Sequence, residues 1–392
     1  MIISYRKGNK IFKFCEPNKN SNNIFSVIVG KNGTGKSRLL NEIIGNFLPE
    51  TFVKRRSEFK SSELEYTNHP KKIIAVSTSP YDKFPIIRSY LNKAQGLNIY
   101  SYVGIRDLKT LDFSLGFMSK IISQLLYTKY NDHNQFNKII EVLHYLGYSD
   151  EIFLKFDIKL NTKATKDLLS SSNIEEEFKY ILSQPGIMRP NLSFFLDVTN
   201  HGDEEDKIDK NKLYNFLDIL HYYNFGQRRI FDVVLDKNHI SSEIRIEDLF
   251  FLMEAGIAKL RDVSLKKLDT GKIYEISEAS SGEQCIFTTL IGISCNIEDN
   301  SLILIDEPEI SLHPEWQEKY ITLLIETFKK YRNCHFIIAT HSPQLISKLS
   351  TENCYILKMD NKELKNAKDY ANNSIDFQLA NIFNAPDLKT NI

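Results

Sequence analysis

The segment Gly30–Ser37 constrains the fold of this chain more than any other. Its letters, GKNGTGKS, match the pattern G-x-x-x-x-G-K-[ST], with an apolar strand at 24–29 before it and helical spacing at 38–44 after it. In such a loop, glycines let backbone N–H groups curl round a phosphate, and the helix N-terminus adds partial positive charge. A plain glycine-rich turn is the alternative, and the place between strand and helix disfavours it. The pattern predicts a nucleoside triphosphate site in a strand–loop–helix unit.

The side chains of this loop have defined parts in that prediction. Lys36 reaches the β- and γ-phosphates, and the hydroxyl of Ser37 ligates Mg²⁺. We therefore expect ATP and Mg²⁺ as cofactors, with Ser37 as a metal ligand. The candidate binding residues of this segment are Gly30, Asn32, Gly33, Gly35, Lys36, Ser37 and Arg38.

Composition and charge narrow the class of protein. The 392 residues suffice for one large domain with an insertion, or for two domains. Lys+Arg and Asp+Glu balance at 50 each, so no net field draws the chain to nucleic acid or to a membrane. The five cysteines lack C-x-x-C spacing, which favours reduced core residues over disulfides or a zinc site. Because the sequence shows no apolar leader and no membrane-length apolar run, we expect a cytoplasmic protein.

A second motif lies near the other end of the sequence, where the apolar run 302–305 closes on Asp306 and Glu307. This arrangement is typical of Walker B: the strand delivers Asp306 to the Mg²⁺ shell as a metal ligand, and Glu307 polarises the attacking water. A buried strand that merely ends in Asp-Glu is the alternative, and the P-loop upstream disfavours it. Pro314 suits the first position of the helix that follows.

His341 follows another apolar strand, at 335–339. A histidine at the tip of the neighbouring strand can hydrogen-bond the γ-phosphate and so report whether ATP or ADP is bound. A capping or surface histidine is the alternative, and the Ser-Pro pair at 342–343, which opens the next helix, favours the switch role. Glu307 and His341 are therefore the candidate catalytic residues.

Between these two halves, Ser281, Gly282 and Glu283 open an apolar helix at 285–291. Serine and glycine at a helix N-terminus form an anion site. Because the P-loop already supplies one, a second indicates that these residues complete the nucleotide pocket of another copy. We expect the chain to work with itself, as a head-to-tail dimer or a multiple of dimers.

The run 280–284 resembles the signature motif of ABC-type ATPases in the form used by SMC, Rad50 and RecF-like proteins. The order of P-loop, signature, Walker B and switch histidine is that of an ABC-type head. The resemblance implies an α/β fold, an ABC-type P-loop ATPase head with a mixed sheet and flanking helices. An AAA+ ring ATPase would call for sensor and arginine-finger elements after Walker B, and it has no use for Ser-Gly-Glu-Gln.

Longer runs narrow the resemblance. Residues 77–84, 279–284, 305–317 and 337–343 resemble the ATPase subunit of Septu and of Septu-like retron anti-phage systems, which is paired with an HNH nuclease. The likeness covers roughly residues 24–105 and 256–392. It implies an ATPase that regulates a separate HNH-type nuclease in a bacterial defence complex, and the sequence itself shows no nuclease centre. Overcoming-lysogenization-defect nucleases have the same sequence motifs at Walker B and at the switch histidine.

Two segments depart from the ABC pattern. No glutamine lies in the loop 77–84, where an ABC head offers one to Mg²⁺ and water, and Asp82 is the polar candidate there. The usual D-loop wording is replaced at 309–313, so Ser311 or His313 is the candidate for communication between two sites. Despite both departures we still expect the chain to bind ATP, but the sequence does not predict the rate of hydrolysis.

We expect three segments: an N-terminal lobe with the P-loop at 1–105, a mostly helical insertion at 106–255, and a C-terminal lobe at 256–392 with signature, Walker B and switch histidine. Apolar faces with helical spacing lie at 113–126, 136–143 and 213–220. Pro185, Pro190 and the lack of sustained heptads exclude the long coiled coil of SMC proteins. A hairpin at 263–276 precedes the signature helix.

Basic clusters at 54–56, 71–72 and 266–267 are candidate contacts for DNA or a non-coding RNA or DNA, and solvated loops are the favoured alternative. Besides the defence ATPase, a RecF/Rad50-like DNA-repair ATPase that loads on DNA itself stays open. A transporter head is disfavoured by the long insertion. No membrane partner is expected.

Overall fold

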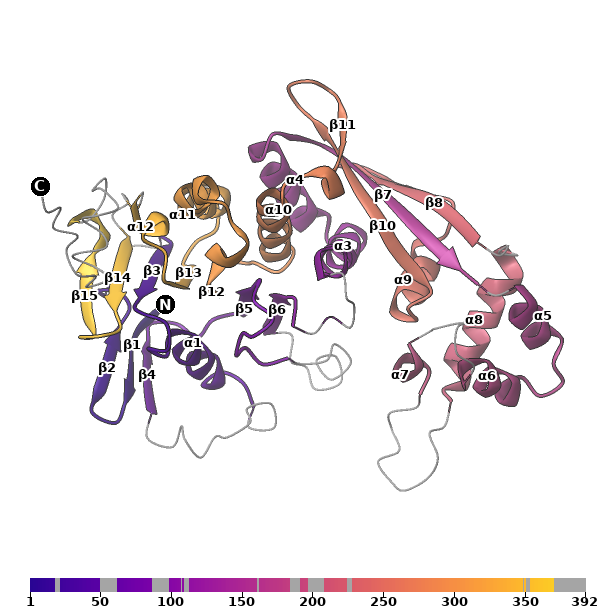
Figure 1. Ribbon diagram of the computed structural model, residues 1–392, viewed down its shortest axis with the longest axis horizontal. Coiled ribbons are helices and arrows are strands. Elements are labelled where there is room, and N and C mark those ends of the chain that lie inside the picture. Colours follow the sequence, from indigo (N-terminus) through magenta and orange to yellow (C-terminus); the bar gives the residue numbers. More distant parts are fainter. Residues whose placement is uncertain are drawn as a thin grey trace, which may run out of the picture. The chain divides into compact units, whose positions relative to one another are not determined.

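The computed structural model places most of the chain in two compact units (Figure 1). It describes residues 1–17, 22–49, 62–86, 99–106, 108, 113–160, 162–183, 191–196, 208–223, 228–347, 349 and 353–369. The basic cluster 54–56 and the two prolines 185 and 190 lie outside these ranges. One unit consists of Met1–Val142 with Ala279–Ile392, and the other of Leu143–Glu278.

The first unit contains a seven-stranded sheet. Its strand order is β15-β14-β3-β13-β12-β5-β6. The strands are β3 (Ile24–Val29), β5 (Lys72–Ser77), β6 (Tyr100–Gly104), β12 (Ser301–Asp306), β13 (His335–Thr340), β14 (Cys354–Lys358) and β15 (Glu363–Asn366). All neighbours run parallel except β14 and β15. The strands expected at 24–29, 302–305 and 335–339 are confirmed as β3, β12 and β13, so the motifs that follow them share one sheet edge.

The central strands are apolar because both faces of the sheet are covered. Every residue of β3, β12, β13 and β14 is buried, as a parallel sheet requires. On one face, alternate residues of these strands pack with α1 (Lys36–Gly45) and with a small antiparallel sheet. That sheet has the order β2-β1-β4, from Lys10–Lys13, Ile2–Lys7 and Ser62–Tyr66. On the other face, Phe328 of α11 (Pro314–Phe328) stacks on Phe336 of β13.

The remaining helices of this unit include α10 (Ser281–Ser294), which begins with the candidate signature residues, and α12 (Pro343–Ser347), which follows the candidate switch residue His341. The others are α3 (Phe113–Asn131) and the 3-10 helix η4 (Pro308–Ser311), and α4 (His133–Tyr145) starts here. Pro314 occupies the first turn of α11, as the sequence predicts. Helix α10 contacts both α3 and α11. The fold class is therefore α/β, with a mixed sheet and flanking helices.

The second unit is built on an antiparallel sheet that the sequence analysis did not predict. Its order is β11-β10-β7-β8-β9. The strands are β7 (Tyr148–Lys159), β8 (Arg228–Leu235), β9 (Ile240–Ser242), β10 (Ala258–Lys267) and β11 (Ile273–Glu275). The helices are α5 (Thr162–Ser170), α6 (Ile174–Ser183), α7 (Leu192–Phe195), α8 (Lys210–Tyr223) and α9 (Ile246–Glu254). Describing the insertion as mostly helical therefore omits its sheet. The hairpin at 263–276 is confirmed by β10 and β11.

This unit has a core of its own. Phe178, Phe195 and Phe216 form an aromatic cluster from three helices, and Phe156 of β7 stacks on Phe231 of β8. The unit covers Leu143–Glu278, whereas the insertion expected from sequence covers 106–255, because α3 belongs to the first unit and the β10–β11 hairpin to the second. Among the described residues, no helix is both long and apolar enough to cross a membrane.

Candidate functional site

The P-loop leads from β3 into α1 through two glycines in the left-handed region. Gly33 has a φ of +81° and Gly35 a φ of +95°, conformations that L side chains rarely adopt. Gly30 is constrained by packing instead, since a Cβ there would lie 3.0 Å from Cβ of Met359. Asn32 is exposed in the loop. The sequence forms a tight backbone cradle at the carboxyl end of the central strand.

Lys36 starts the helix that follows this cradle. Gly35 is the N-cap, and no side chain of the described residues caps it. The Lys36 ammonium is buried and donates to the carbonyl oxygen of Gly30 at 2.8 Å. Burial lowers the pKa of Lys36, while the nearby carboxylates of Glu307, Glu309 and Asp306 oppose that shift. A buried cation beside an uncapped helix N-terminus fits a triphosphate.

Arg38 points elsewhere. Its Nε lies 2.9 Å from Oε1 of Glu42 one turn along α1, and its side chain is 59% exposed. The geometry gives Arg38 a partner within the helix, so its assignment to the nucleotide stays a prediction.

Ser37 and Asp306 meet, although they come from opposite ends of the sequence. The Ser37 hydroxyl donates to Oδ1 of Asp306 at 3.0 Å. Asp306 ends β12 and is 3% exposed, and burial raises its pKa to about 7, against the opposing effect of the Ser37 hydrogen bond. A buried carboxylate and a hydroxyl are hard oxygen donors of the kind that Mg²⁺ prefers, so these two residues fit a magnesium ion.

Glu307 and His341 are the next pair that the sheet brings together. Glu307 adopts a left-handed backbone, φ 47° and ψ 56°, which a non-glycine residue holds only when its surroundings impose it. Its N–H donates to the carbonyl of Ala339 in β13. Its Oε1 lies 3.8 Å from Nδ1 of His341. Walker B and the switch histidine are therefore adjacent, as parallel strands β12 and β13 require.

A carboxylate that the sequence analysis did not single out lies closer to this histidine. Oε1 of Glu309 is 3.1 Å from Nδ1 of His341. The signal for it is its place in η4, directly after Walker B, where a turn can carry a side chain back toward the sheet edge. Gln317 of α11 was also missed: it accepts a hydrogen bond from the Ser342 hydroxyl at 2.7 Å and thus ties α11 to the switch loop.

The signature residues are held by their own helix start. Ser280 and Glu283 form a capping box, in which the Ser280 hydroxyl accepts from the Glu283 N–H at 3.3 Å and the Glu283 carboxylate accepts from the Ser280 N–H at 3.0 Å. Ser281 is exposed, and Gly282 is buried. Within the described part of the chain, no hydrogen bond joins Ser281, Gly282 or Glu283 to the P-loop. The structure does not bring them together with the P-loop of the same chain.

Asp82, the candidate substitute for the missing glutamine, has local partners. It is 3% exposed, and it accepts hydrogen bonds from the Tyr102 hydroxyl at 2.7 Å and from the Phe84 N–H at 2.9 Å. Oδ1 also lies 3.4 Å from Nη1 of Arg106. These contacts fix the loop after β5, so the carboxylate is engaged in its own loop. Ser311 is half-buried in η4, and His313 is the exposed N-cap of α11.

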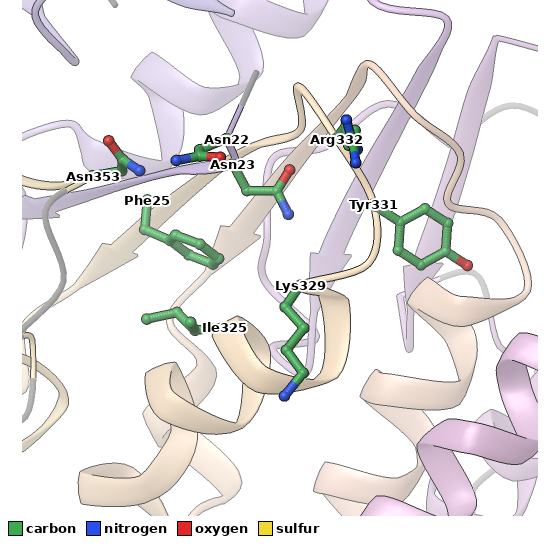
Figure 2. Close-up of a pocket in the computed structure, with 8 residues that line it drawn as sticks. All are labelled: Asn22, Asn23, Phe25, Ile325, Lys329, Tyr331, Arg332 and Asn353. Atoms are coloured by element: carbon green, nitrogen blue, oxygen red, sulfur yellow. The ribbon is translucent and has the colours of Figure 1, made fainter. Parts of the chain in front are cut away.

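A pocket of about 410 Å³ lies at the opposite edge of the same sheet (Figure 2). Its lining residues are Asn22, Asn23, Phe25, Ile325, Lys329, Tyr331, Arg332 and Asn353. Apart from Ile325 and Lys329, at the end of α11, they precede or start β3, β13 and β14, whereas the P-loop, Asp306 and His341 lie at or after the carboxyl ends of their strands. This pocket is therefore separate from the candidate nucleotide site. Among the described residues, no group of three or more His, Cys, Asp or Glu could hold a metal ion.

A comparison with known families identifies the family of this chain. Residues 141–347 match the family described as "AAA domain, putative AbiEii toxin, Type IV TA system". The chain belongs to this family. The P-loop of this AAA-domain protein implies that it binds ATP.

Two curated relatives have retron names. The "Retron Vc95 probable ATPase" of Vibrio cholerae serotype O1 biovar El Tor is 20% identical over an alignment 398 positions long, which covers 91% of this chain and 72% of that protein. The "Retron Ec83 probable ATPase" of Escherichia coli is 28% identical over an alignment 134 positions long, which covers 30% of this chain. The alignment spans only 24% of the E. coli protein. This AAA-domain protein is thus related to retron ATPases.

Solved structures give weaker similarity. An ATP-binding cassette of an ABC transporter in its ADP conformation has a TM-score of 0.34 at 12% identity, over 97% of this chain and 96% of that one. An SMC head domain from Pyrococcus furiosus, bound to the C-terminal domain of ScpA, has a TM-score of 0.32 at 12% identity, over 93% and 95%. The fold class rests on the strand order and P-loop of the chain itself.

Proposed function

We propose that this chain is the ATP-hydrolysing subunit of a bacterial anti-phage defence complex, in which it gates a separate nuclease of the HNH type. The observation that carries the ATPase part is the hydrogen bond between Ser37 and Asp306, with Glu307 and His341 on adjacent strands. It joins the P-loop and the Walker B strand at one sheet edge. The defence part is supported by the retron names of the two relatives.

In this proposal, different residues of the chain bind the nucleotide, hold the metal ion and act on the water. Lys36 and the N-terminus of α1 bind and orient the phosphates, and Ser37 with Asp306 holds Mg²⁺. Bound Mg²⁺ would neutralise charge on the phosphate oxygens. Glu307 orients and polarises the attacking water, and His341 senses the γ-phosphate. The exposed Ser281, with Gly282, serves the P-loop of a second copy, which makes a head-to-tail dimer the working unit.

Paired substitutions test the ATPase proposal. Lys36→Ala should abolish ATP binding, because it removes a contact to the ground-state phosphates. Glu307→Gln should keep ATP affinity and slow hydrolysis by on the order of 10²–10⁴-fold, because Glu307 acts on the water. Titration with a fluorescent ATP analogue and phosphate release separate the two effects. Equal loss of nucleotide affinity in both variants would remove Glu307 from its assigned role.

A second experiment tests the partner. The chain and its neighbouring genes are expressed together, and the chain is purified by a tag. We expect a small HNH-type protein to co-purify, and we expect ATP to inhibit its cleavage of DNA, with Lys36→Ala as the control that no longer responds to ATP. A chain that purifies without a partner and loads on DNA in an ATP-dependent way would favour a RecF/Rad50-like repair ATPase instead.

A further inference from the structure

Glu309 is a buried carboxylate beside the candidate site that none of the roles above uses. It lies in η4, three residues after Asp306, and its side chain is 5% exposed. The left-handed backbone of Glu307 reverses the chain at this point. As a result, Glu307 and Glu309 both approach the ring of His341.

The contacts of Glu309 converge on the switch segment. Its Oε1 accepts from the Thr340 hydroxyl at 2.7 Å and from the His341 N–H at 2.7 Å. The same oxygen lies 3.1 Å from Nδ1 of His341, whereas Oε1 of Glu307 is 3.8 Å from that nitrogen, beyond hydrogen-bonding distance. A carboxylate oxygen can only accept, so this close approach at 3.1 Å is attractive only when Nδ1 carries the proton.

The other oxygen of Glu309 shows that this carboxylate is not placed for burial alone. Oε2 is buried and has no hydrogen-bond partner among the described residues. Leaving a carboxylate oxygen unsatisfied in the interior destabilises a fold, and an apolar side chain would not carry that cost. A charged group kept under these conditions is typical of a functional site.

We propose that Glu309 is the positioning residue of the switch histidine. It holds the proton on Nδ1 of His341, fixes the ring, and leaves Nε2 as the nitrogen that meets the γ-phosphate. Glu309 does not touch the nucleotide and acts through His341. This inference rests on the proposed function, in which His341 senses the γ-phosphate.

The tautomer of His341 tests the contact without any nucleotide. The chain contains nine histidines, so ¹⁵N-histidine NMR with His341→Asn as the assignment reference identifies the signal. We expect the Nδ1–H tautomer in the natural protein. In Glu309→Gln we expect a shift toward Nε2–H, because a neutral amide oxygen replaces the charged acceptor. An Nε2–H tautomer in the natural protein, or no change in Glu309→Gln, overturns the proposal.

Kinetics test what the contact does. Glu309→Gln should leave the Kd for ATP within about twofold and lower kcat on the order of 10–100-fold, as loss of an orienting partner does. The double variant with His341→Asn should be no slower than His341→Asn alone, since Glu309 acts through the histidine. Glu315→Gln, an exposed change in the first turn of α11, is the matched control and should keep natural turnover.

The outcomes separate this inference from the proposed function. An NMR shift without a change in kcat overturns the positioning role, and so does an additive double variant. If the natural protein shows no ATPase activity, the proposed function fails, while the tautomer measurement still decides the contact. If Glu309→Gln does not fold, Glu309→Asp keeps the charge and shortens the reach; the same tautomer shift and the same loss of kcat are expected, and their absence overturns the proposal.

Discussion

At the scale of single residues, the candidate site keeps a charge where the fold would be more stable without it. Asp306 is buried at the end of β12, and burial raises its pKa to about 7. Its hydrogen bond from Ser37 offsets only part of the lost hydration. This fits the proposal that the side chain is retained for binding a cation, at some cost to the stability of the nucleotide-free protein.

This gives a prediction for Asp306→Asn. The amide keeps the acceptor for Ser37 and removes the buried charge, so the free energy of unfolding at pH 8 should rise by about 1–3 kcal/mol. The increase in melting temperature that ATP with Mg²⁺ gives the natural protein should be lost. Urea unfolding without nucleotide and thermal unfolding with it measure the two effects. A less stable variant would show that the carboxylate contributes to the fold.

His335 is a second buried ionisable residue, remote from the phosphate site. It begins β13, where Nδ1 accepts from the Ile2 N–H at 3.1 Å and Nε2 lies 2.8 Å from the Ser26 hydroxyl. Because that hydroxyl donates to the carbonyl of Phe14, the network assigns the ring proton to Nε2. Burial, with the nearby N-terminal ammonium, lowers the pKa of His335 from 6.5 to about 3.

His335 should therefore make stability fall as the pH falls below 6.5. The unfolded chain takes up a proton there while the folded chain does not, so the loss begins at the unfolded pKa and continues to about pH 3. Between pH 6.5 and 5 this one group accounts for a loss of about 2 kcal/mol. Urea unfolding of the natural chain and of His335→Asn compares the two slopes. Parallel slopes would contradict the assignment.

The sequence predicts some of these residues and not others, for a physical reason. Lys36, Ser37 and Asp306 lie in motifs whose spacing itself encodes the geometry, and the structure places Ser37 on Asp306. The contacts of Glu309 depend on a left-handed Glu307 and a single 3-10 turn. No periodicity encodes such a reversal of the chain. The sequence therefore predicts His341 itself, but it could not predict the contact between Glu309 and His341.

At the scale of elements, α10 and α11 pack with a glycine against the single tryptophan of the chain. A Cβ on Gly282 would lie 3.0 Å from Cδ1 of Trp316. Even an alanine there must displace the indole slightly. A substitution at Gly282 therefore disturbs its own chain as well as any second copy, and Ser281, which is exposed, is the better position for testing the dimer.

Mixing two inactive variants tests whether the signature acts on a second copy. Ser281→Glu should fold, since an acidic residue is favoured at a helix N-terminus, but it should repel the γ-phosphate of the partner copy. Mixed with Lys36→Ala, it should restore about a quarter of the natural ATPase activity, because half of the random dimers hold one intact site of two. Phosphate release measures it. Mixed dimers without activity would show that Ser281 does not act across copies.

Elements were predictable where one pattern dominated. The apolar runs of β3, β12 and β13 match their strands within a residue. In β7, buried residues alternate at Ile152, Leu154, Phe156 and Ile158, a period of two that indicates a strand. That signal was present and was missed, because the helical spacing on both sides of it suggested a helical insertion.

At the scale of the whole molecule, the unit Leu143–Glu278 is closed on itself. Tyr148, at the start of β7, pairs with Lys267, at the end of β10, so the segment leaves its sheet close to where it entered. Its boundaries could not be read from sequence, since pairing between residues this far apart leaves no local pattern.

The segment 143–278 should therefore fold when produced alone. Its five-stranded sheet and its phenylalanine cluster supply a core without residues from the other unit. We expect strand and helix signals in far-UV circular dichroism and one cooperative thermal transition. Phe156→Ala, which removes a buried ring stacked on Phe231, should lower its stability by about 3–5 kcal/mol. A non-cooperative melt of the natural segment would show that its core is incomplete.

The position of β3 in the sheet has a consequence for synthesis on the ribosome. Both of its neighbours, β13 and β14, come from residues 335–358, although β3 itself spans Ile24–Val29. The strand that delivers the P-loop therefore emerges early and has neither of its partners until residues 335–358 have been translated. Any product truncated before residue 335 lacks both neighbours of this strand. Translation as far as these two strands is thus a precondition for the pairing of β3, and a message interrupted before residue 335 yields a P-loop strand without either neighbour.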